Sequence, residues 1–549
     1  MKKKFTILLI IFIFLLSILF ENKNIVVSEN IDSSEDTTKD ISGEIVSNSD
    51  NKNSEVNTPP PIFTKFDTVP ELLKNFKYQI KDGENYTNTT NLNGTSNYST
   101  IKGISTFRGN NYRNNAFYGT LNIKENILEK KWTNTIGKLD NWTGVGWNGQ
   151  PAIIQWDKDV KKQMNIYEEF KQKENFTEVI YGALDSFIYF YDLDTGLLTR
   201  EPLKVESSIK GSVTIDPRGY PLLYVGQGIN QVSGESVSMG YHIFSLIDGK
   251  ELYFINGRDK FAYLGWGAFD GNPIIDTETD TMILPGENGL IYIVKLNTIY
   301  DKTNGKISIN PQVARYRYTQ NGRAGGTENS MTIFKNYAFF VNNNGVVQCL
   351  DLNTLTPIWT HNMEDDCDAT IGLEEKDNNI YLYVACEVDK RTIDSLAHIK
   401  KLNGRTGEVI WDYTCECKYD ATVNGGVLSS PIVGEKNISD LVIYSISKTT
   451  SLRAGKLVAL NKNDGNVIWE KDLTAYSWSS PVAAYTENGD AYIIFADSYG
   501  QIFLINGKTG EILYKLQTGG GNFEGSPAIF NNHIVIGSRG KKIFRIDIK

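Results

Sequence analysis

Short apolar runs bounded by turn residues recur along most of the chain. Between Gly455 and Asn461, successive positions alternate between the two faces of a predicted strand, and both faces are largely apolar. Asn463-Asp464-Gly465 then favours a tight turn, and Val467-Ile468-Trp469 begins a returning strand. The stretch 455–469 therefore predicts a β-hairpin that is buried on both faces.

The same hairpin pattern occurs at three further places in the second half of the chain. In each copy an aromatic residue follows the turn Gly, or its equivalent, by four positions. The aromatic positions of the four copies are Trp359, Trp411, Trp469 and Tyr514. A constant spacing of this kind is typical of a repeat protein.

A second marker counts the repeats, because a small or polar residue followed by Pro and an aliphatic residue precedes many of the apolar runs. Pro is tolerated at the first residue of a strand, which need not donate a ladder hydrogen bond. Five clear copies centre on Pro151, Pro273, Pro431, Pro481 and Pro527, and three degraded copies on Ser212, Ser330 and Ala369. These eight starts are 39 to 62 residues apart, which leaves room for four short strands in each unit.

The two ends of the repeat region predict that the array closes on itself. The chain stops after 542–548, which corresponds to the third strand of a unit and has no fourth strand after it. The missing aromatic strand is present at the front, where 126–132 ends in Trp132 before any first strand. Radial closure also hides the sheet edges that an open array would expose. We therefore expect an all-β, eight-bladed β-propeller of four-stranded antiparallel blades over 126–549, closed by the N-terminal strand.

Three segments precede the repeats. Lys2, Lys3 and Lys4 lead into an apolar run from Phe5 to Phe20, so 1–24 is predicted to be a signal peptide or a transmembrane anchor that places the rest outside the cytoplasm. Residues 25–62 are rich in Ser, Asn, Asp and Glu and predict a disordered linker. Residues 63–125 form an N-terminal extension to the propeller. The expected location is extracytoplasmic in the cell envelope, either membrane-anchored or secreted (extracellular).

The charge balance excludes one class of partner. The 549 residues carry a formal net charge of −9, and no basic cluster interrupts the repeat region. Proteins that bind nucleic acid use a basic surface to neutralise phosphates. We therefore expect no nucleic-acid partner, and we expect a monomer.

The motif Ala459-x-Asn461-x-x-Asp464-Gly465-x-x-x-Trp469 resembles the tryptophan-docking motif of the pyrroloquinoline quinone (PQQ) dehydrogenase propellers. The same pattern occurs in cofactor-free relatives, including the propeller subunit of the outer-membrane β-barrel assembly machinery. The segment Thr106–Arg113 resembles one that precedes the propeller in PQQ-like repeat proteins of Gram-positive anaerobes. We expect the repeat tryptophans to dock between neighbouring blades, in preference to stacking on a ligand, and these are Trp132, Trp359, Trp411 and Trp469.

The resemblance also implies a cofactor chemistry that this chain does not match. Family dehydrogenases bind PQQ beside a disulfide between adjacent cysteines and hold a calcium ion with a carboxylate and an amide. The nearest approach to such a pair is Cys415-Glu-Cys417, and no catalytic-Asp segment is recognisable. A shared fold does not carry a function with it. We therefore expect no catalytic residue, no cofactor and no metal site.

Five cysteines lie within about seventy residues, at positions 349, 367, 386, 415 and 417. An exported protein can form disulfides, and a pair such as Cys367 with Cys386 is compatible with the spacing. The connectivity stays open, and the odd number leaves one thiol over. A zinc site is less favoured than structural thiols, because the four histidines are scattered.

The loops that precede the strand starts are expected to converge on one face of the propeller, around its central channel. They combine aromatic platforms with single charges, which suits a peptide or a glycan. The candidate residues for this ligand face are Trp147, Lys210, Trp266, Arg323, Glu328, Trp478, Phe523 and Glu524. The favoured alternative is that these aromatic residues plug the channel or pack between the loops.

Two functions remain open from the sequence. The favoured one is a non-catalytic extracytoplasmic propeller, membrane-tethered or secreted, that serves as a scaffold and binds a protein or a cell-wall glycan. The alternative is a PQQ-dependent quinoprotein-type oxidoreductase. Binding of PQQ and calcium, seen as a chromophore with alcohol oxidation, separates the two.

Overall fold

The computed structural model describes residues 64–83, 88–96, 98–147, 149–390 and 395–549 of the chain. The predicted signal peptide or anchor at 1–24 and the predicted linker at 25–62 lie outside the described residues. No helix in the described part of the chain has the length and apolar character needed to cross a membrane.

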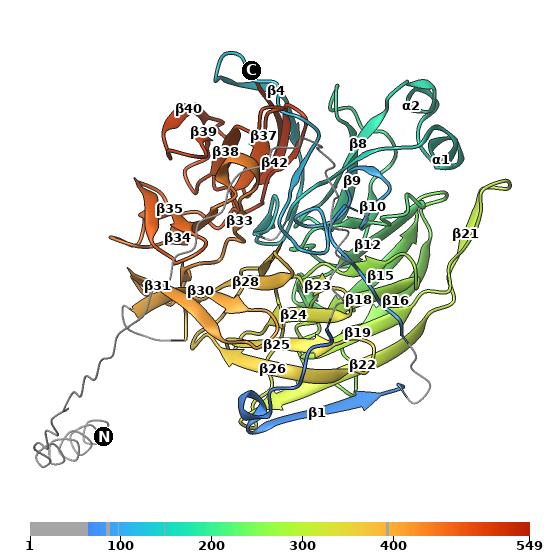
Figure 1. The fold of residues 1–549 in the computed structure, drawn as a ribbon. Coiled ribbons are helices and arrows are strands. Elements are labelled where there is room, and N and C mark those ends of the chain that lie inside the picture. The colour runs from blue at the N-terminus through green and yellow to red at the C-terminus, as the bar shows by residue number, and fades with distance from the viewer. Residues whose placement is uncertain (1–63, 84–87, 97, 148, 391–394) are drawn as a thin grey trace, which may run out of the picture. The chain divides into compact units, whose positions relative to one another are not determined.

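Eight sheets follow one another around a ring in chain order (Figure 1). Blades 1 and 2 consist of β7 (Ala152–Gln155), β8 (Thr177–Gly182), β9 (Phe187–Asp192), β10 (Leu203–Lys204), and of β11 (Thr214–Ile215), β12 (Leu222–Gly226), β15 (Gly240–Ser245), β16 (Glu251–Asn256). Blades 3 and 4 consist of β17 (Ile274–Asp276), β18 (Thr281–Pro285), β19 (Leu290–Lys295), β22 (Gln312–Gln320), and of β23 (Thr332–Phe334), β24 (Tyr337–Val341), β25 (Val346–Asp351), β26 (Thr356–Asn362).

The second half of the ring repeats this order. Blades 5 and 6 consist of β27 (Gly372–Lys376), β28 (Asn379–Ala385), β30 (Ser395–Asn403), β31 (Val409–Cys417), and of β33 (Ile432–Val433), β34 (Leu441–Ser447), β35 (Gly455–Asn461), β36 (Val467–Leu473). Blades 7 and 8 consist of β37 (Val482–Tyr485), β38 (Ala491–Ala496), β39 (Gln501–Asn506), β40 (Ile512–Gln517), and of β41 (Ala528–Phe530), β42 (His533–Ser538), β43 (Lys542–Ile548), β4 (Leu128–Thr135). Neighbouring strands within each blade are antiparallel.

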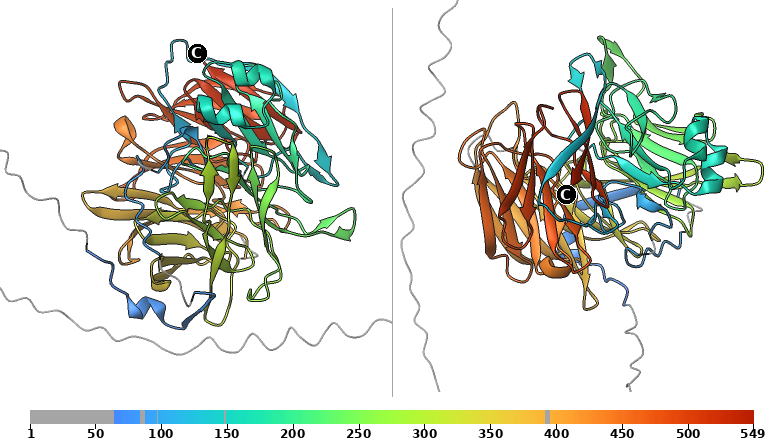
Figure 2. Two further views of the ribbon diagram at one scale, coloured as in Figure 1. Left: turned by 90° about the vertical axis from the view of Figure 1, so that its right-hand side faces the viewer. Right: turned by 90° about the horizontal axis from the view of Figure 1, so that it is seen from above.

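The remaining elements are short. They are β1 (Phe76–Lys81), β2 (Lys102–Ile104), β3 (Phe117–Tyr118), the two-stranded pairs β5 (Lys138–Leu139) with β6 (Trp142–Thr143), β13 (Gln231–Val232) with β14 (Glu235–Ser236), β20 (Ile299–Asp301) with β21 (Lys306–Ser308) and β29 (Glu387–Val388) with β32 (Gly425–Gly426), and the helices α1 (Lys158–Gln163), α2 (Glu168–Gln172), η1 (Pro70–Leu73) and η2 (Lys436–Ile438). The two α-helices lie between β7 and β8 and project from the rim of the ring (Figure 2). The repeat pattern predicted no helix there.

The strand-by-strand burial explains the apolar runs of the sequence. Every residue of β8, β15 and β34 is buried. In a propeller both faces of a middle strand contact a neighbouring blade, so both must be apolar. The fourth strands lie at the outer edge, and β36 accordingly is mostly exposed, with only Trp469 and Leu473 buried.

The four repeat tryptophans each contact the turn of the following blade. The ring of Trp359 packs on Gly407, where an added Cβ would lie 2.7 Å from the indole, and its Nε1 donates to the carbonyl oxygen of Gly404 at 3.1 Å. The indole nitrogens of Trp132, Trp411 and Trp469 donate in the same way to the carbonyls of Leu193, Lys462 and Gly507 at 2.9, 3.0 and 3.1 Å. The turn glycines have positive φ, so both backbone conformation and contact with the ring require glycine.

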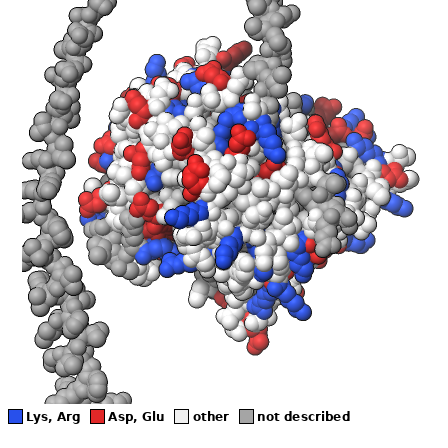
Figure 3. All heavy atoms as spheres, turned by 60° about the horizontal axis from the view of Figure 1, so that its bottom comes forward, with Lys and Arg blue, Asp and Glu red and all other residues white. Residues whose placement is uncertain are grey.

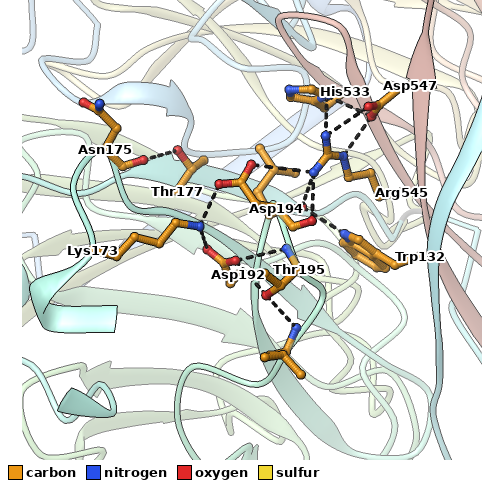
Figure 4. A network of polar contacts seen from close by, with 12 residues as sticks. Trp132, Lys173, Asn175, Thr177, Asp192, Asp194, Thr195, His533, Arg545 and Asp547 are labelled. Atoms are coloured by element: carbon orange, nitrogen blue, oxygen red, sulfur yellow. Dashed lines mark hydrogen bonds and ion pairs between the residues drawn. The ribbon is translucent and has the colours of Figure 1, made fainter. Parts of the chain in front are cut away.

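The two ends of the propeller meet in blade 8. Strand β4 pairs antiparallel with β43, with Leu128 opposite Ile548 and Trp132 opposite Arg545 (Figure 1). Arg545 extends into the turn of blade 1 and donates to the carbonyl oxygens of Leu193 and Asp194 at 2.9 and 3.1 Å (Figure 4). Blade 8 therefore combines strands from both ends of the propeller and is bonded to blade 1 by polar contacts.

Asp547 makes this junction sensitive to acid. It accepts hydrogen bonds from Arg545 at 2.8 and 3.0 Å and contacts His533 Nδ1 at 2.8 Å. Burial acts to raise the pKa of Asp547, but the bonds from His533 and Arg545 lower it to about 2. Since the folded pKa lies below the unfolded value, the ionised carboxylate stabilises the fold fully above about pH 4, and this contribution is lost as the pH falls towards about 2.

We therefore expect Asp547→Asn to lower the free energy of unfolding at pH 7 by up to about 2 kcal/mol. The difference from the wild type should shrink as the pH is lowered from about 4 to 2. Urea unfolding at several pH values measures both quantities. The exposed Asp472→Asn is the matched control, and an equal effect of the two substitutions would contradict the assignment.

The N-terminal extension contributes strands to three blades. Strand β1 pairs with β22 at the outer edge of blade 3, whereas β2 pairs with β7 and β3 pairs, in parallel, with β41. Blades 2, 4, 5 and 7 are four-stranded sheets, but blades 1, 3 and 8 each have a fifth strand and β32 adds to blade 6. The expectation of four strands in every blade was therefore wrong for these four blades. The additional strands lie outside the repeat pattern, so that pattern could not predict them.

Residues 104–117 of the extension, named here the channel segment, lie at the centre of the ring. Its backbone carbonyls at Ser105, Asn111, Tyr112 and Ala116 accept hydrogen bonds from the first strands of blades 2, 4, 5 and 8 at 2.7, 2.8, 3.1 and 3.0 Å. Ile104 pairs with Ile153 of blade 1. The channel segment thus bonds to five of the eight blades through its backbone alone.

Two buried arginines of the channel segment reach the remaining blades. Arg108 donates to the carbonyl oxygens of Pro431 and Pro481, at the starts of blades 6 and 7, the latter at 2.7 Å. Arg113 donates to the carbonyl oxygens of Asn272 and Pro273, at the start of blade 3, at 3.0 and 2.9 Å. The Pro-containing strand starts therefore converge on one segment, and every blade contacts it.

Candidate functional site

The loops before the first strands and the loops between the second and third strands open on the same face of the ring. This follows from the antiparallel pairing, since a first strand begins where the second strand ends. We name this face the mouth. The extension contacts the turns between first and second strands instead, for example Leu92 with Lys335 and Thr100 with Pro217, and so covers the opposite face.

A group of three carboxylates lies in the mouth at blades 3 and 4. Asp270 precedes β17, Glu287 lies between β18 and β19, and Glu328 precedes β23. Each side chain offers an oxygen atom, and the three oxygens lie within 4.8 Å of one another. Two of these residues were not among the sequence candidates, whereas Glu328 was.

One largely buried cation partly compensates these carboxylates. Lys210 Nζ lies 3.3 Å from Asp270 Oδ2. Burial alone would lower the pKa of Lys210, but Asp270, Glu287 and Glu328 together raise it, so the amine is protonated at neutral pH. Burial also raises the pKa of Asp270 more than Lys210 lowers it, and burial with the nearby Asp270 raises the pKa of Glu328 to about 7.

Aromatic side chains border this group. Trp266, which is 38% exposed, donates its indole N–H to Glu287 Oε2 at 2.7 Å. Two cations lie near the ring of Trp142, with Lys210 Nζ and the Arg539 guanidinium 5.7 and 5.9 Å from a ring centroid. Arg539 in turn donates to Glu524 at 2.9 Å. The structure therefore connects Lys210, Trp266, Glu328 and Glu524 in one network of charges and rings.

Other sequence candidates are placed differently. Trp478 is half-buried beside Tyr476, with ring centroids 6.0 Å apart, and its indole nitrogen has no hydrogen-bond partner. Trp147 is half-buried on the loop before β7, and Arg323 is exposed on the turn after β22. Phe523 has no exposed surface and packs edge-on against Phe544, 5.9 Å between centroids, so it belongs to the core and not to a ligand surface.

A second group of carboxylates lies one blade further on. Asp366 and Asp368 are on the loop between β26 and β27, and Glu387 opens β29. Their oxygen atoms also lie within 4.8 Å of one another, and all three residues are buried. The sequence analysis did not select them. The sequence did contain a signal for them, because these acidic residues occur both on loops before first strands and on loops between second and third strands. A search restricted to aromatic residues and strand starts overlooks that signal.

The thiols do not provide the adjacent pair that the resemblance to PQQ dehydrogenases would require. All five cysteines are free, and Cys367 and Cys386 are buried without a disulfide between them. Cys415 and Cys417 lie on β31, two positions apart. In addition, the channel segment fills the centre of the ring. The residues present therefore do not fit the PQQ site of the dehydrogenases.

A large groove lies away from the mouth. It has a volume of about 1300 Å³ and lies beside α1 and α2 on the rim of blade 1, next to Tyr300. Its lining mixes several lysines with Asp157, Asp159 and Glu174. On the face shown in Figure 3, acidic and basic side chains are likewise interspersed. The groove therefore lacks the concentration of carboxylates that is found at the mouth.

Comparison with known proteins supports the fold. A family model described as outer membrane protein assembly factor BamB matches residues 453–549. No curated protein sequence matches the chain. The crystal structure of BamB from Moraxella catarrhalis is 15% identical, with 77% of this chain and 98% of that chain covered and a TM-score of 0.46.

Two solved enzymes share the fold more closely by TM-score. Quinohemoprotein alcohol dehydrogenase ADHIIG from Pseudomonas putida HK5 is 10% identical, covering 81% of this chain and 80% of that chain, with a TM-score of 0.52. Quinohemoprotein alcohol dehydrogenase from Comamonas testosteroni is 12% identical, covering 82% and 81%, with a TM-score of 0.52. At these identities the likeness concerns the fold alone. Its eight blades, its tryptophan-docked turns and the match of residues 453–549 to the BamB family model make this chain similar in fold to the PQQ-like β-propellers.

Proposed function

We propose that the protein is a non-catalytic, extracytoplasmic scaffold that binds a basic segment of a partner protein at the mouth of its propeller. The observation that carries this proposal is the composition of the mouth. Six carboxylates from the two groups lie there, and the lysines paired with them are Lys210 and Lys390. These six carboxylates outnumber the two lysines and lie beside partly exposed tryptophans.

Such a surface suits lysine and arginine side chains. Their charged ends pair with carboxylates, and their apolar stems, or a guanidinium plane, lie against indole rings. Trp266 and Trp478 supply such rings, and the free indole N–H of Trp478 can donate to a backbone carbonyl of the partner. The basic tip and apolar run of 2–20 support a location outside the cytoplasm, tethered or secreted.

The test is capture of partners from a native envelope extract by the full chain. We expect Trp147→Ala, Trp266→Ala and Trp478→Ala, combined in one variant, to lower capture at least about tenfold, because aromatic anchors dominate such interfaces. The captured protein should present a cluster of Lys or Arg. The control variant combines Tyr78→Ala, Leu197→Ala and Ile468→Ala, which removes exposed apolar residues from strands and turns away from the mouth.

Three results would overturn the proposal. One is unchanged capture by the folded mouth variant, and another is an equal loss in the control variant. The third is a bound chromophore with alcohol oxidation after incubation with PQQ and calcium, which would establish the oxidoreductase alternative. Capture of purified cell-wall glycan in place of protein would contradict the partner chemistry.

A further inference from the structure

The second carboxylate group has little compensation from the protein itself. Asp366, Asp368 and Glu387 are 6%, 8% and 0% exposed. Lys390 Nζ lies 2.7 Å from Asp366 Oδ2, but its side chain is half-exposed and therefore hydrated. The first group also has buried oxygens without a hydrogen-bond partner, on Asp270 and Glu287, but it differs because the Lys210 side chain, only 15% exposed, faces all three of its carboxylates.

Glu387 has an oxygen atom directed into this group without a donor. Its Oε2 accepts from Asn424 Nδ2 at 2.7 Å, which fixes the orientation of the carboxylate. Its Oε1 is buried and accepts no hydrogen bond from an N–H or hydroxyl group of the described residues, and the neighbouring carboxyl of Asp368 offers a donor only when it is protonated. A buried unpartnered carboxylate oxygen is costly, so this atom indicates a ligand that the protein does not supply.

The separation of the oxygens fits a hard divalent cation. Calcium–oxygen distances are about 2.3–2.6 Å, so two oxygens on opposite sides of one Ca²⁺ lie about 5 Å apart. The three oxygens here lie within 4.8 Å of one another. Hard cations such as Ca²⁺ prefer carboxylate oxygens as ligands, whereas softer metals prefer nitrogen or sulfur ligands.

We propose that Asp366, Asp368 and Glu387 bind one divalent cation, Ca²⁺ in the first place, in the mouth of the propeller. Asn424 positions Glu387 for this role. Because Glu387 pairs with Gly426 in β29–β32, the cation joins the loop before β27 to the strand pair that leads into blade 6. The test of this inference needs only the cation and not the proposed partner, but a bound Ca²⁺ would neutralise the second carboxylate group and leave the first group for that partner.

The experiment uses the full chain freed of metal with a chelator and titrated with CaCl₂ or MgCl₂ alone. We expect calorimetry to show one Ca²⁺ per chain, with a dissociation constant between roughly 10⁻⁷ and 10⁻³ M. Saturating Ca²⁺ should raise Tm by a few degrees, since a ligand that binds only the folded state stabilises it. Absence of binding and of any Tm shift up to about 10 mM Ca²⁺ would overturn the proposal.

The variants distinguish a cation site from mere repulsion. Asp368→Asn and Glu387→Gln should each weaken Ca²⁺ binding at least about tenfold, because each removes one charged ligand. Without Ca²⁺ the Tm of these variants should equal or exceed that of the wild type, since the substitutions remove repulsion between carboxylates. With saturating Ca²⁺ their Tm should be lower than that of the wild type. Lys390→Met removes a competing charge and should tighten binding about three- to tenfold.

The matched control is Glu287→Gln in the first carboxylate group, which should leave Ca²⁺ affinity unchanged. If Glu287→Gln abolishes binding while Glu387→Gln preserves it, the site is in the other group and the assignment is wrong. A Glu387→Gln variant that melts well below the wild type in the absence of Ca²⁺ would likewise contradict it, because the carboxylate would then be a structural group satisfied by the protein.

Discussion

Replacing Arg113 with alanine is expected to lower the free energy of unfolding by on the order of 5 kcal/mol, because several charged hydrogen bonds are lost at once. The guanidinium is fully buried and donates to the carbonyl oxygens of Met331, Asn272 and Pro273 at 3.0, 3.0 and 2.9 Å. It also donates to Phe107 and Thr106 within the channel segment, at 2.7 and 2.9 Å. Burial lowers the pKa of Arg113 to about 10, so the group is still charged at neutral pH.

The loss should exceed that of an ordinary core truncation, because it leaves buried carbonyls without donors at the centre of the ring. Urea unfolding, followed by tryptophan fluorescence, measures it. Arg113→Lys keeps the charge but cannot reach the same acceptors, so its loss of unfolding free energy should be close to that of Arg113→Ala. The exposed Arg258→Ala should change stability by less than about 0.5 kcal/mol. Equal midpoints for Arg113→Ala and Arg258→Ala would mean that the channel segment does not hold the blades together.

The second large effect is expected from Trp359→Ala, which should cost about 3–5 kcal/mol. Trp359 has no exposed surface, packs on Gly407 of the next blade and donates to Gly404. Alanine would leave a cavity between blades 4 and 5 and an unpaired carbonyl. Urea unfolding gives the free-energy difference.

Two companion substitutions separate the contributions in this contact. Trp359→Phe keeps most of the apolar area but loses the hydrogen bond, so it should cost less than alanine. Trp266→Ala, at a 38% exposed position, should change stability far less than Trp359→Ala. If the two tryptophans behave alike, the repeat tryptophan does not dock the blades.

The repeat architecture could be predicted because its determinants are local. Strand, turn Gly and Trp fall within one hairpin, so Gly465 and Trp469 are visible a few positions apart. The eight strand starts likewise recur along the sequence, where they can be counted. The position of Trp132 opposite Arg545 follows the strand order expected from the two chain ends.

The candidate site could be predicted only in part. Lys210, Trp266 and Glu328 do lie together, since loops of one topological kind open on one face. Phe523 could not be separated from them, because its sequence neighbours do not reveal Phe544, which covers it. Asp270 and Glu287 come from two different loops of blade 3, and nothing in their sequence separation indicates that their oxygens meet.

The sequence by itself determined the number of blades and the aromatic contacts between them, because the markers of each repeat lie close together in the chain. The tertiary structure alone decided the role of the channel segment, the additional strands from the extension and the two carboxylate groups. These features depend on which residues burial brings together from distant loops. Burial also decides whether a carboxylate such as Glu387 is a solvated charge or an unpartnered ligand.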